Sequence, residues 1–375
     1  MTNPIKAIVT PSLDPKYGGP SVSIPALVDA MHTIDSTARL YAAGPSWQGE
    51  PSWPTYVLRY PDARPLRLRR SPQLRAALLR DELTIVHHHA LWLPTLGYSH
   101  QAARRHRCPL VVSPRGMLSP YALARSRWRK KLAACCIPPG ALRDAAGWHA
   151  TSDDEARDIR QAGFHQPIVV ARNGVTVPAW HEAVDRHGWH ERYPQLAGKR
   201  VALFFSRLHS VKGILPLLNW WSESKATNDW HLLVAGSADE YTLDDLAAHA
   251  ARLKISGRVT LADPVGLAKP YPLAELYILP SASENFGLTV AEALVSGVPT
   301  LVSANAPWHE INGIDAGRCV PLDDFPKQLD ALLRRSPDEL KAMGGRGRDF
   351  VRSTFSWQQQ ARLLLEFYDK LVAAG

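Results

Sequence analysis

The stretch Ser281–Ser303, SASENFGLTVAEALVSGVPTLVS, carries the clearest structural signal in this chain of 375 residues. It begins where an apolar strand ends, and its first polar residues are typical of turns and helix caps. Phe286-Gly287 then opens a helix that we expect to run to about Ser296, where Gly297 stops it. Pro299 begins the next strand. This order predicts one strand–helix–strand unit of a parallel sheet.

Strand and helix signals alternate in the same way over most of the chain, which predicts an α/β fold. The expected strands are Ile5–Thr10, Leu83–His87, Leu110–Ser113, Gly147–Ala150 and Ile168–Ala171, followed by Val201–Phe205, Trp230–Ala235, Val259–Leu261, Tyr277–Pro280 and Pro299–Val302. Helical periodicity separates them, for example over Leu93–Arg104 and Ala122–Ala134.

The alternation is interrupted once, at Pro178–Lys199, which is polar, rich in Trp and His and without a clear period. We interpret this stretch as the connection between two Rossmann-like, doubly wound domains, residues 1–180 and residues 181–355. A last amphipathic helix, at about 356–375, is expected to pack back on the first domain. Two such units place a ligand cleft between the facing carboxyl ends of their strands.

Composition and charge limit the possible functions. Hydrophobic residues make up 45% and charged residues 21% of the chain, which is typical of globular proteins. No apolar run reaches the roughly 20 residues of a membrane-spanning helix, and the N-terminus resembles no signal peptide, so we expect a cytoplasmic protein.

The net charge of +9 is unevenly distributed along the chain. Residues 1–180 hold 23 lysines and arginines against 12 acidic residues, whereas the remainder holds 21 against 23. Most of the excess lies between Arg59 and Lys131. A one-sided positive field favours an anionic partner for the first half: a membrane surface, a phosphorylated substrate or nucleic acid.

Two glutamates in the opening stretch are candidates for ligand binding. Glu284 lies in the loop before the helix and Glu292 just over a turn inside it, so both carboxylates can face one ligand. Ionised carboxylates accept paired hydrogen bonds from vicinal hydroxyls, and free amides at a helix start bind ligand oxygens. The alternative is that both glutamates are solvated side chains flanking a helix.

The string S-E-x-F-G-x-x-x-x-E-A with a following G-x-P resembles the E-x7-E signature of retaining glycosyltransferases of the GT-B architecture, particularly glycosyltransferase family 4. The resemblance implies that the first glutamate contacts hydroxyls of the donor sugar and the second contacts the ribose. Amides near F-G help to hold the sugar. The donor-binding residues it implies are Glu284, Asn285, Phe286, Gly287, Leu288 and Glu292.

Two further strings resemble the same family. Ser206–Gly213, SRLHSVKG, is similar to its G-R-L-x-x-x-K-G, with Ser206 in place of the usual glycine. Arg207 and Lys212 would then bind the donor diphosphate and neutralise it as it departs. In Lys16–Ser21, KYGGPS, Gly18 and Gly19 resemble the family's G-G, which closes on the donor phosphates.

Histidines follow two expected strands. Ile85–Trp92, IVHHHALW, resembles the family string V-H-x-H-x-L-W, which implies that His89 and Trp92 border the acceptor. Consecutive histidines in a strand point to opposite faces, so the triplet itself is a poor metal site. Trp148–Ser152, WHATS, resembles H-A-T-S, and His149 is predicted to bond the transferred sugar or its phosphate. Its alternative is a structural histidine.

The expected catalytic set is therefore His149, Glu284, Arg207 and Lys212. Ser113–Leu118, SPRGML, resembles a string of bacterial polysaccharide enzymes in the family, which makes Arg115 a candidate for the acceptor phosphate or the donor. The basic segment Arg125–Lys131 is either a contact with an anionic membrane or a solvated helix face.

The metal-binding D-x-D motif of the other major glycosyltransferase architecture is missing, and Asp153-Asp154-Glu155 fits the first turn of a helix better. We therefore expect transfer without metal or cofactor. The resemblance implies a retaining hexosyltransferase that uses a UDP- or GDP-sugar and a saccharide acceptor. That acceptor is expected to be lipid-linked, at the inner face of the cytoplasmic membrane, in cell-surface polysaccharide or lipopolysaccharide assembly.

Other functions remain compatible with the same sequence. A nucleotide-sugar 2-epimerase or a phosphorylase would keep the fold and change the reaction. The epimerase would need a further carboxylate cluster, and the phosphorylase would need a lysine-bound pyridoxal phosphate. A non-enzymatic RNA- or membrane-binding protein would use the basic first half, but no base-stacking motif accompanies it, so we expect no nucleic-acid partner.

Overall fold

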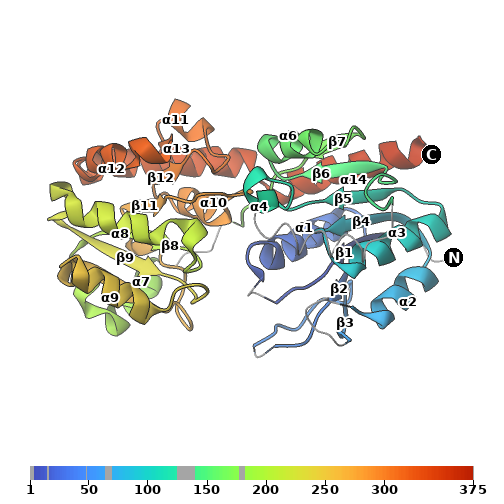
Figure 1. The fold of residues 1–375 in the computed structure, drawn as a ribbon, viewed down its shortest axis with the longest axis horizontal. Helices are drawn as coiled ribbons and strands as arrows, with labels where there is room; N and C mark the ends of the chain where they lie inside the picture. The colour runs from blue at the N-terminus through green and yellow to red at the C-terminus, as the bar shows by residue number, and fades with distance from the viewer. Residues whose placement is uncertain are drawn as a thin grey trace. The chain divides into compact units, whose positions relative to one another are not determined.

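The computed structural model describes residues 4–14, 17–47, 49–63, 70–124, 140–176 and 182–374. The chain forms two compact units, one of Met1–Gly174 with Phe355–Gly375 and one of Val175–Thr354 (Figure 1). Each unit is a parallel sheet covered by helices. The predicted fold class of two Rossmann-like domains is confirmed.

The first unit is built on seven strands in the order β3-β2-β1-β4-β5-β6-β7. Their bounds are β1 Ile5–Thr10, β2 Ala38–Ala43, β3 Val57–Tyr60, β4 Leu83–His89, β5 Leu110–Ser113, β6 Gly147–Ala150 and β7 Ile168–Val170, and all neighbours pair in parallel. The helices are α1 Pro20–Ile34, α2 Pro72–Arg80, α3 Pro94–His106, α4 Pro120–Ala124, α6 Asp153–Gln161 and α14 Trp357–Ala373.

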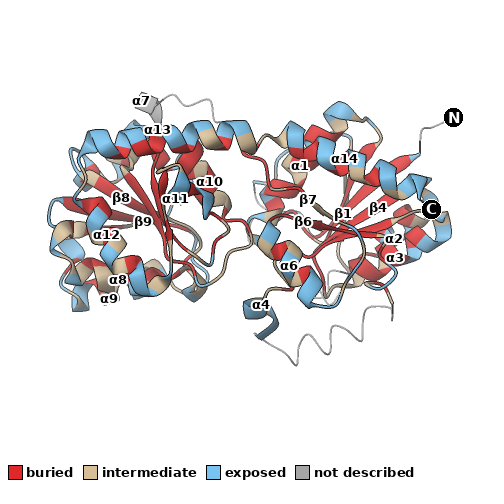
Figure 2. Cartoon of the chain, turned by 90° about the horizontal axis from the view of Figure 1, so that it is seen from above, coloured by how far each residue is buried: buried red, intermediate tan, exposed pale blue. Residues whose placement is uncertain are grey.

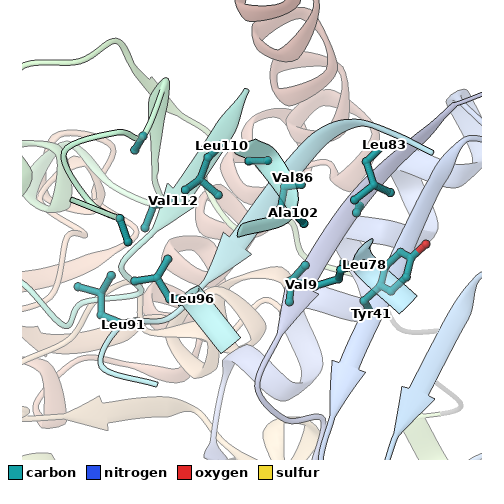
Figure 3. Packing of buried hydrophobic residues seen from close by; sticks show 14 of the residues in the cluster. Val9, Tyr41, Leu78, Leu83, Val86, Leu91, Leu96, Ala102, Leu110 and Val112 are labelled. Atoms are coloured by element: carbon teal, nitrogen blue, oxygen red, sulfur yellow. The ribbon is translucent and has the colours of Figure 1, made fainter. Parts of the chain in front are cut away.

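Both faces of this sheet are apolar because alternate residues of each strand point to opposite sides. On one face Val9, Val86 and Val112 pack with residues of α2 and α3 such as Leu78 and Leu96 (Figure 3). On the other, Ile8, Ile85 and Val111 pack with α1 and α14, which also contact each other. Strands are accordingly buried and the outer helix faces exposed (Figure 2).

The second unit repeats the winding with six parallel strands in the order β10-β9-β8-β11-β12-β13. The strands are β8 Arg200–Phe205, β9 Trp230–Ala235, β10 Val259–Ala262, β11 Leu276–Leu279, β12 Thr300–Ser303 and β13 Gly317–Val320. The helices are α7 Glu182–Arg192, α8 Ile214–Glu223, α9 Leu243–Arg252, α10 Leu288–Val295, α11 Glu310–Gly313, α12 Phe325–Leu333 and α13 Pro337–Thr354. Strand order reverses between β8 and β11, which opens a crevice at their carboxyl ends.

Three strands were not expected from the sequence: β2, β3 and β13. Their sequences, ARLYAA, VLRY and GRCV, each contain an arginine that breaks the apolar run. The stretch Pro178–Lys199, in which no clear helical period was found, contains the helix α7. The indole of Trp189 on α7 is buried and donates a 2.8 Å hydrogen bond to the carbonyl of Ala268.

Part of the expected helix Ala122–Ala134 and the basic segment Arg125–Lys131 lie outside the described residues. Among the helices that are described, no stretch combines the length and apolar character needed to cross a membrane.

We predict that α14 stabilises the first unit through its buried face. Leu364 is fully buried between α14 and the sheet, whereas its neighbour Leu363 is 39% exposed. Leu364→Ala should lower the free energy of unfolding by about 2–5 kcal/mol, because the cavity adds to the lost burial. Leu363→Ala is the matched control, and urea unfolding of both variants checks the difference. Equal effects would contradict the assignment of the buried face.

Candidate functional site

In the second unit, the loops after β8 and β11 are joined at the reversal of strand order. The N–H of Ala282 donates to the carbonyl of Val211 at 2.7 Å, and the Ser281 hydroxyl donates to the same oxygen at 2.9 Å. Gly213 has φ +73°, and a Cβ there would lie 2.1 Å from the carbonyl oxygen of Pro280. Only glycine therefore lets the two loops approach this closely.

Lys212 and Glu284 form an ion pair across this junction. Their side chains are 14% and 8% exposed, so the pair is largely removed from water. The N–H of Glu284 donates to the carbonyl of Asn305 at 3.1 Å, which fixes the loop that carries the carboxylate. The structure therefore brings these two predicted site residues together at the crevice.

Glu292, on the partly exposed face of α10, has partners that the sequence did not point out. The Tyr271 hydroxyl donates to one carboxylate oxygen at 2.8 Å, and the Lys269 ammonium lies 2.5 Å from the other. Burial, and next the charge of Glu292, raise the pKa of Tyr271 well above its usual value, so Tyr271 stays a hydrogen-bond donor. Lys269 and Tyr271 follow β10 and belong to no recognisable string, which is why sequence reasoning missed them.

Arg207 has a different partner from Lys212. Its guanidinium lies 2.6 Å from the carboxylate of Asp239, and both side chains are more than a third exposed. Exposed pairs of this kind contribute about 0–1 kcal/mol, so Arg207 can exchange Asp239 for another anion at little cost. Asp239, in the loop after β9, was not singled out from the sequence.

The start of α10 is fixed by packing. Gly287 caps the helix with φ +75°, and Leu288 is the first helical residue. The indole of Trp308 donates to the carbonyl of Phe286 at 2.5 Å and would lie 3.3 Å from a Cβ on Gly287. Asn285 lies between Glu284 and Phe286 in this loop.

In the first unit, Gly18 and Gly19 lie directly before α1. Gly18 has φ +80°, and Gly19 is the N-cap with no atom within 4 Å of a Cβ built on it. The backbone here is open to approach by a ligand. Lys16 of the same string lies outside the described residues.

Three histidines gather on one face of the first sheet. His87 and His89 of β4 point to the side where His149 of β6 lies, and His88 points to the opposite side, where Ser99 contacts it. The nitrogens of His87, His89 and His149 lie within 4.8 Å of one another. Sequence reasoning foresaw the alternation but not this group, since β5 separates β4 from β6 and no local spacing links them.

The hydrogen-bond directions around His149 are fixed by chemistry. Its Nε2 lies 2.8 Å from the carbonyl oxygen of Ala171, which can only accept, so Nε2 carries the proton. Nδ1 of His149 then accepts from Nε2 of His87 at 3.4 Å, and Nδ1 of His87 accepts from the Tyr368 hydroxyl at 2.6 Å. Both ring nitrogens of His149 are therefore engaged.

Arg115 adds a buried positive charge to this group. It donates from Nε to Nδ1 of His89 at 3.1 Å and from Nη1 to the Asn173 amide oxygen at 2.9 Å. Burial lowers the pKa of Arg115 to about 10, so it remains charged at neutral pH. The histidines are uncharged, because burial lowers the pKa of His149 to about 3 and that of His89 well below its usual value. A metal cation at the three histidines would face this guanidinium and compete for Nδ1 of His89.

The loops after β5 and β6 are tied by a buried carboxylate that the sequence did not identify as part of a site. Glu155 accepts from the N–H of Gly116 at 2.6 Å and from the N–H and hydroxyl of Thr151 at 2.7 and 2.8 Å. The prediction that it belongs to the first turn of a helix is confirmed, with Ser152 as the cap of α6. Trp92, in the loop after β4, has φ +62° and packs partly buried against the core of the first unit.

Two protein-family models match the chain. One, described as glycosyl transferase 4-like domain, matches residues 18–174, and the other, glycosyl transferases group 1, matches residues 199–335. Together they cover most of both units.

Curated relatives align over part of the chain. A D-inositol 3-phosphate glycosyltransferase of Segniliparus rotundus is 31% identical over 188 residues, which is 47% of this chain and 41% of the relative. The enzyme of the same name from Mycobacterium marinum is 28% identical over 236 residues, 59% of this chain and 49% of the relative. The chain thus matches about half the length of these relatives.

Solved structures resemble the chain over nearly its whole length. Sucrose-phosphate synthase from Thermosynechococcus elongatus has a TM-score of 0.75 at 17% identity and covers 99% of this chain and 100% of its own. HepE of Anabaena in complex with UDP-glucose has a TM-score of 0.72 at 17% identity, with 98% and 100% covered. At these identities the likeness establishes the fold.

We predict that the buried, uncharged histidines make the first unit sensitive to acid. The pKa of His88 is lowered to about 3 from a model-peptide value of 6.5 because it is buried. Between these pH values the unfolded chain binds more protons, so the free energy of unfolding falls as the pH is lowered. Each such histidine contributes a slope of up to about 1.4 kcal/mol per pH unit.

Urea unfolding between pH 7 and pH 4 measures this slope. His88→Asn should reduce it, whereas the same change at His187, which is exposed, should not. An unchanged slope in His88→Asn would contradict the prediction.

Proposed function

Because the chain belongs to the glycosyltransferases, with a glycosyltransferase 4-like domain followed by a group 1 domain, we propose that it transfers a hexose from a nucleotide-sugar to a saccharide acceptor. The observation that carries the proposal is the largely buried Lys212–Glu284 ion pair at the carboxyl ends of β8 and β11. Open α/β sheets bind ligands at this reversal of strand order.

Lys212 and Arg207 are the proposed partners of the donor diphosphate, whose two negative charges they match. Lys212 already binds the carboxylate of Glu284, and Arg207 that of Asp239. When a diphosphate binds, each cation therefore exchanges one ionic partner for another. Positive charge close to the leaving oxygen stabilises the transition state, because negative charge develops there as the glycosidic bond breaks.

Glu284 and Glu292 are the proposed partners of the donor hydroxyls. When Lys212 pairs with the diphosphate in place of Glu284, the carboxylate of Glu284 becomes available to hydroxyls of the sugar. The backbone amides near Phe286, Gly287 and Leu288 then bind oxygens of the same donor sugar. Glu292 keeps Tyr271 and retains lone pairs for the vicinal hydroxyls of a ribose.

We propose retention of anomeric configuration without metal or cofactor. The departing diphosphate oxygen takes the proton of the acceptor hydroxyl on the same face. Lys212 and Arg207 are proposed to supply the positive charge that a metal would otherwise supply. None of the residues in the proposed site is assigned as a covalent nucleophile. The 3.4 Å hydrogen bond between Nδ1 of His149 and His87 is longer and weaker than the one from Nε2 to Ala171. We propose that a hydroxyl of the transferred sugar replaces His87 at Nδ1.

The acceptor is assigned to the first unit, through His89, Trp92 and Arg115. We propose a lipid-linked saccharide at the inner face of the cytoplasmic membrane, in cell-surface polysaccharide assembly. The positive charge of residues 1–180 and the SPRGML string support this assignment. A solved structure of similar fold, WaaG, is described as a glycosyltransferase involved in lipopolysaccharide biosynthesis.

The test is release of nucleoside diphosphate from UDP- and GDP-sugars in a buffer that contains a metal chelator. Glu284→Gln should lower kcat/KM by about 100-fold or more, as expected for a lost charged contact to the reacting group. Glu275→Gln is the matched control: its ion pair with Arg200 lies at the opposite ends of the same two strands. Turnover of none of these donors, or equal losses in both variants, would contradict the proposal.

Tyr271 gives a second prediction, specific to Glu292. Tyr271→Phe should weaken nucleotide binding about 10-fold, because hydrogen bonds to charged groups contribute about 1.5–3 kcal/mol. KM should rise with little change in kcat, since the ribose does not react. Tyr277→Phe is the control, because that buried hydroxyl bonds Thr289 on the same helix at 2.7 Å. Calorimetric titration with the nucleoside diphosphate measures the effect; unchanged affinity in Tyr271→Phe would refute it.

A further inference from the structure

Unpartnered polar groups gather at the carboxyl ends of β4 and β5 in the first unit. His89 pairs with Ser113 in the sheet register, so their side chains lie side by side on one face. Arg115 follows two residues later and bonds His89. His89 Nε2, Ser113 Oγ and Arg115 Nη2 are all buried and have no hydrogen-bond partner among the described residues.

Two of these three atoms are obligatory donors. Arg115 donates to Nδ1 of His89, so the proton of the uncharged His89 ring is on Nε2. The guanidinium of Arg115 has donors only, and the Ser113 hydroxyl can rotate to donate as well. Buried donors left without partners cost about 1–3 kcal/mol each, so three of them on residues that are joined by strand pairing and by the Arg115–His89 hydrogen bond call for an acceptor.

The charge at this place also lacks a counterpart. Arg115 is 9% exposed and, within the described part of the chain, has no carboxylate at ion-pair distance. Glu155 influences it from further away, but both oxygens of Glu155 already accept from Gly116 and Thr151. A single water has two lone pairs, so it satisfies at most two of the donors and leaves the guanidinium uncompensated.

The backbone conformation of the loops after β4 and β5 supports a functional role for this group of donors. Ala90, Trp92 and Arg115 have φ of +78°, +62° and +54°, in the left-handed region that non-glycine residues avoid. These are the loops that follow β4 and β5. Strained residues of this kind persist where the surrounding structure holds a site in place.

We propose that His89 Nε2, Ser113 Oγ and Arg115 Nη2 form an oxyanion subsite that binds a phosphate or carboxylate group. The chemistry of the three atoms requires a ligand with several acceptor oxygens and a negative charge. Resting on the proposed function, this means that the acceptor saccharide carries a phosphate or a carboxylate.

The test is a titration of the full-length protein, labelled with 15N in its histidine rings and free of nucleotide. Inorganic phosphate, methyl phosphate, acetate and uncharged glycerol are added while the NMR signal of His89 Nε2–H is followed. A saturable shift is expected with the anions and none with glycerol. Tighter binding of methyl phosphate than of acetate indicates a phosphorylated acceptor, and the reverse indicates a carboxylate.

Variants separate the subsite from the fold and from the second unit. His89→Asn keeps an acceptor near Nδ1 for Arg115 and removes the Nε2 donor, so the anion affinity of this variant, measured by calorimetric titration alongside the wild type, should fall at least tenfold. His88→Asn, the next residue on the opposite face, is the matched control and should keep wild-type affinity. Ser113→Ala provides a milder loss if His89→Asn folds poorly, and Lys212→Ala should leave the His89 signal unaffected.

Absence of a saturable shift at His89, or an equal loss of affinity in His88→Asn, overturns the inference. The readout requires no turnover, so it is independent of the proposed function. Nucleotide-sugar turnover without anion binding at His89 refutes only the subsite, whereas anion binding without turnover supports the subsite and refutes only the glycosyl transfer.

Discussion

The reversal of strand order between β8 and β11 is the constraint on which the second unit's site depends. The chain continues from the two strands to opposite sides of the reversal point. The crevice at the carboxyl ends of β8 and β11 is therefore lined by the loops that follow these strands. Those loops meet only because Gly213 places its backbone against the carbonyl of Pro280. The Lys212–Glu284 ion pair lies on this junction, and the cap of α10 at Gly287 follows it directly.

A different constraint applies to the first unit: the imidazole rings on a buried face of its sheet need hydrogen-bond partners for their nitrogens. The hydrogen-bond chain from Tyr368 through His87 and His149 to the carbonyl of Ala171 gives each nitrogen of these two rings one partner, and burial keeps both rings uncharged. Arg115 then supplies the charge of the group, with Nε bonded to His89, Nη1 bonded to Asn173 and Nη2 left without a partner among the described residues. We propose that the two units bind anions in different ways, the second through the paired cations Lys212 and Arg207 and the first through unpaired donors.

Local patterns predicted much of this fold and named several residues of the candidate site. Apolar runs identified ten of the strands, and Gly297 with Pro299 marked the end of α10, because these signals act over a few residues. The strands β2, β3 and β13, the partners Tyr271 and Lys269 of Glu292, and the grouping of His149 with His87 and His89 were missed. These strands, partners and groupings depend on contacts between segments that are distant in the sequence. No family motif marks those segments, so the sequence of a single chain gives no signal for them.

A crystal structure of the protein with a bound nucleotide-sugar tests the central claim most directly. The account predicts a diphosphate against Lys212 at the carboxyl ends of β8 and β11, with Glu284 on sugar hydroxyls and Glu292, still bonded by Tyr271, on the ribose. A nucleotide-sugar bound elsewhere, with the Lys212–Glu284 ion pair unchanged, would contradict it.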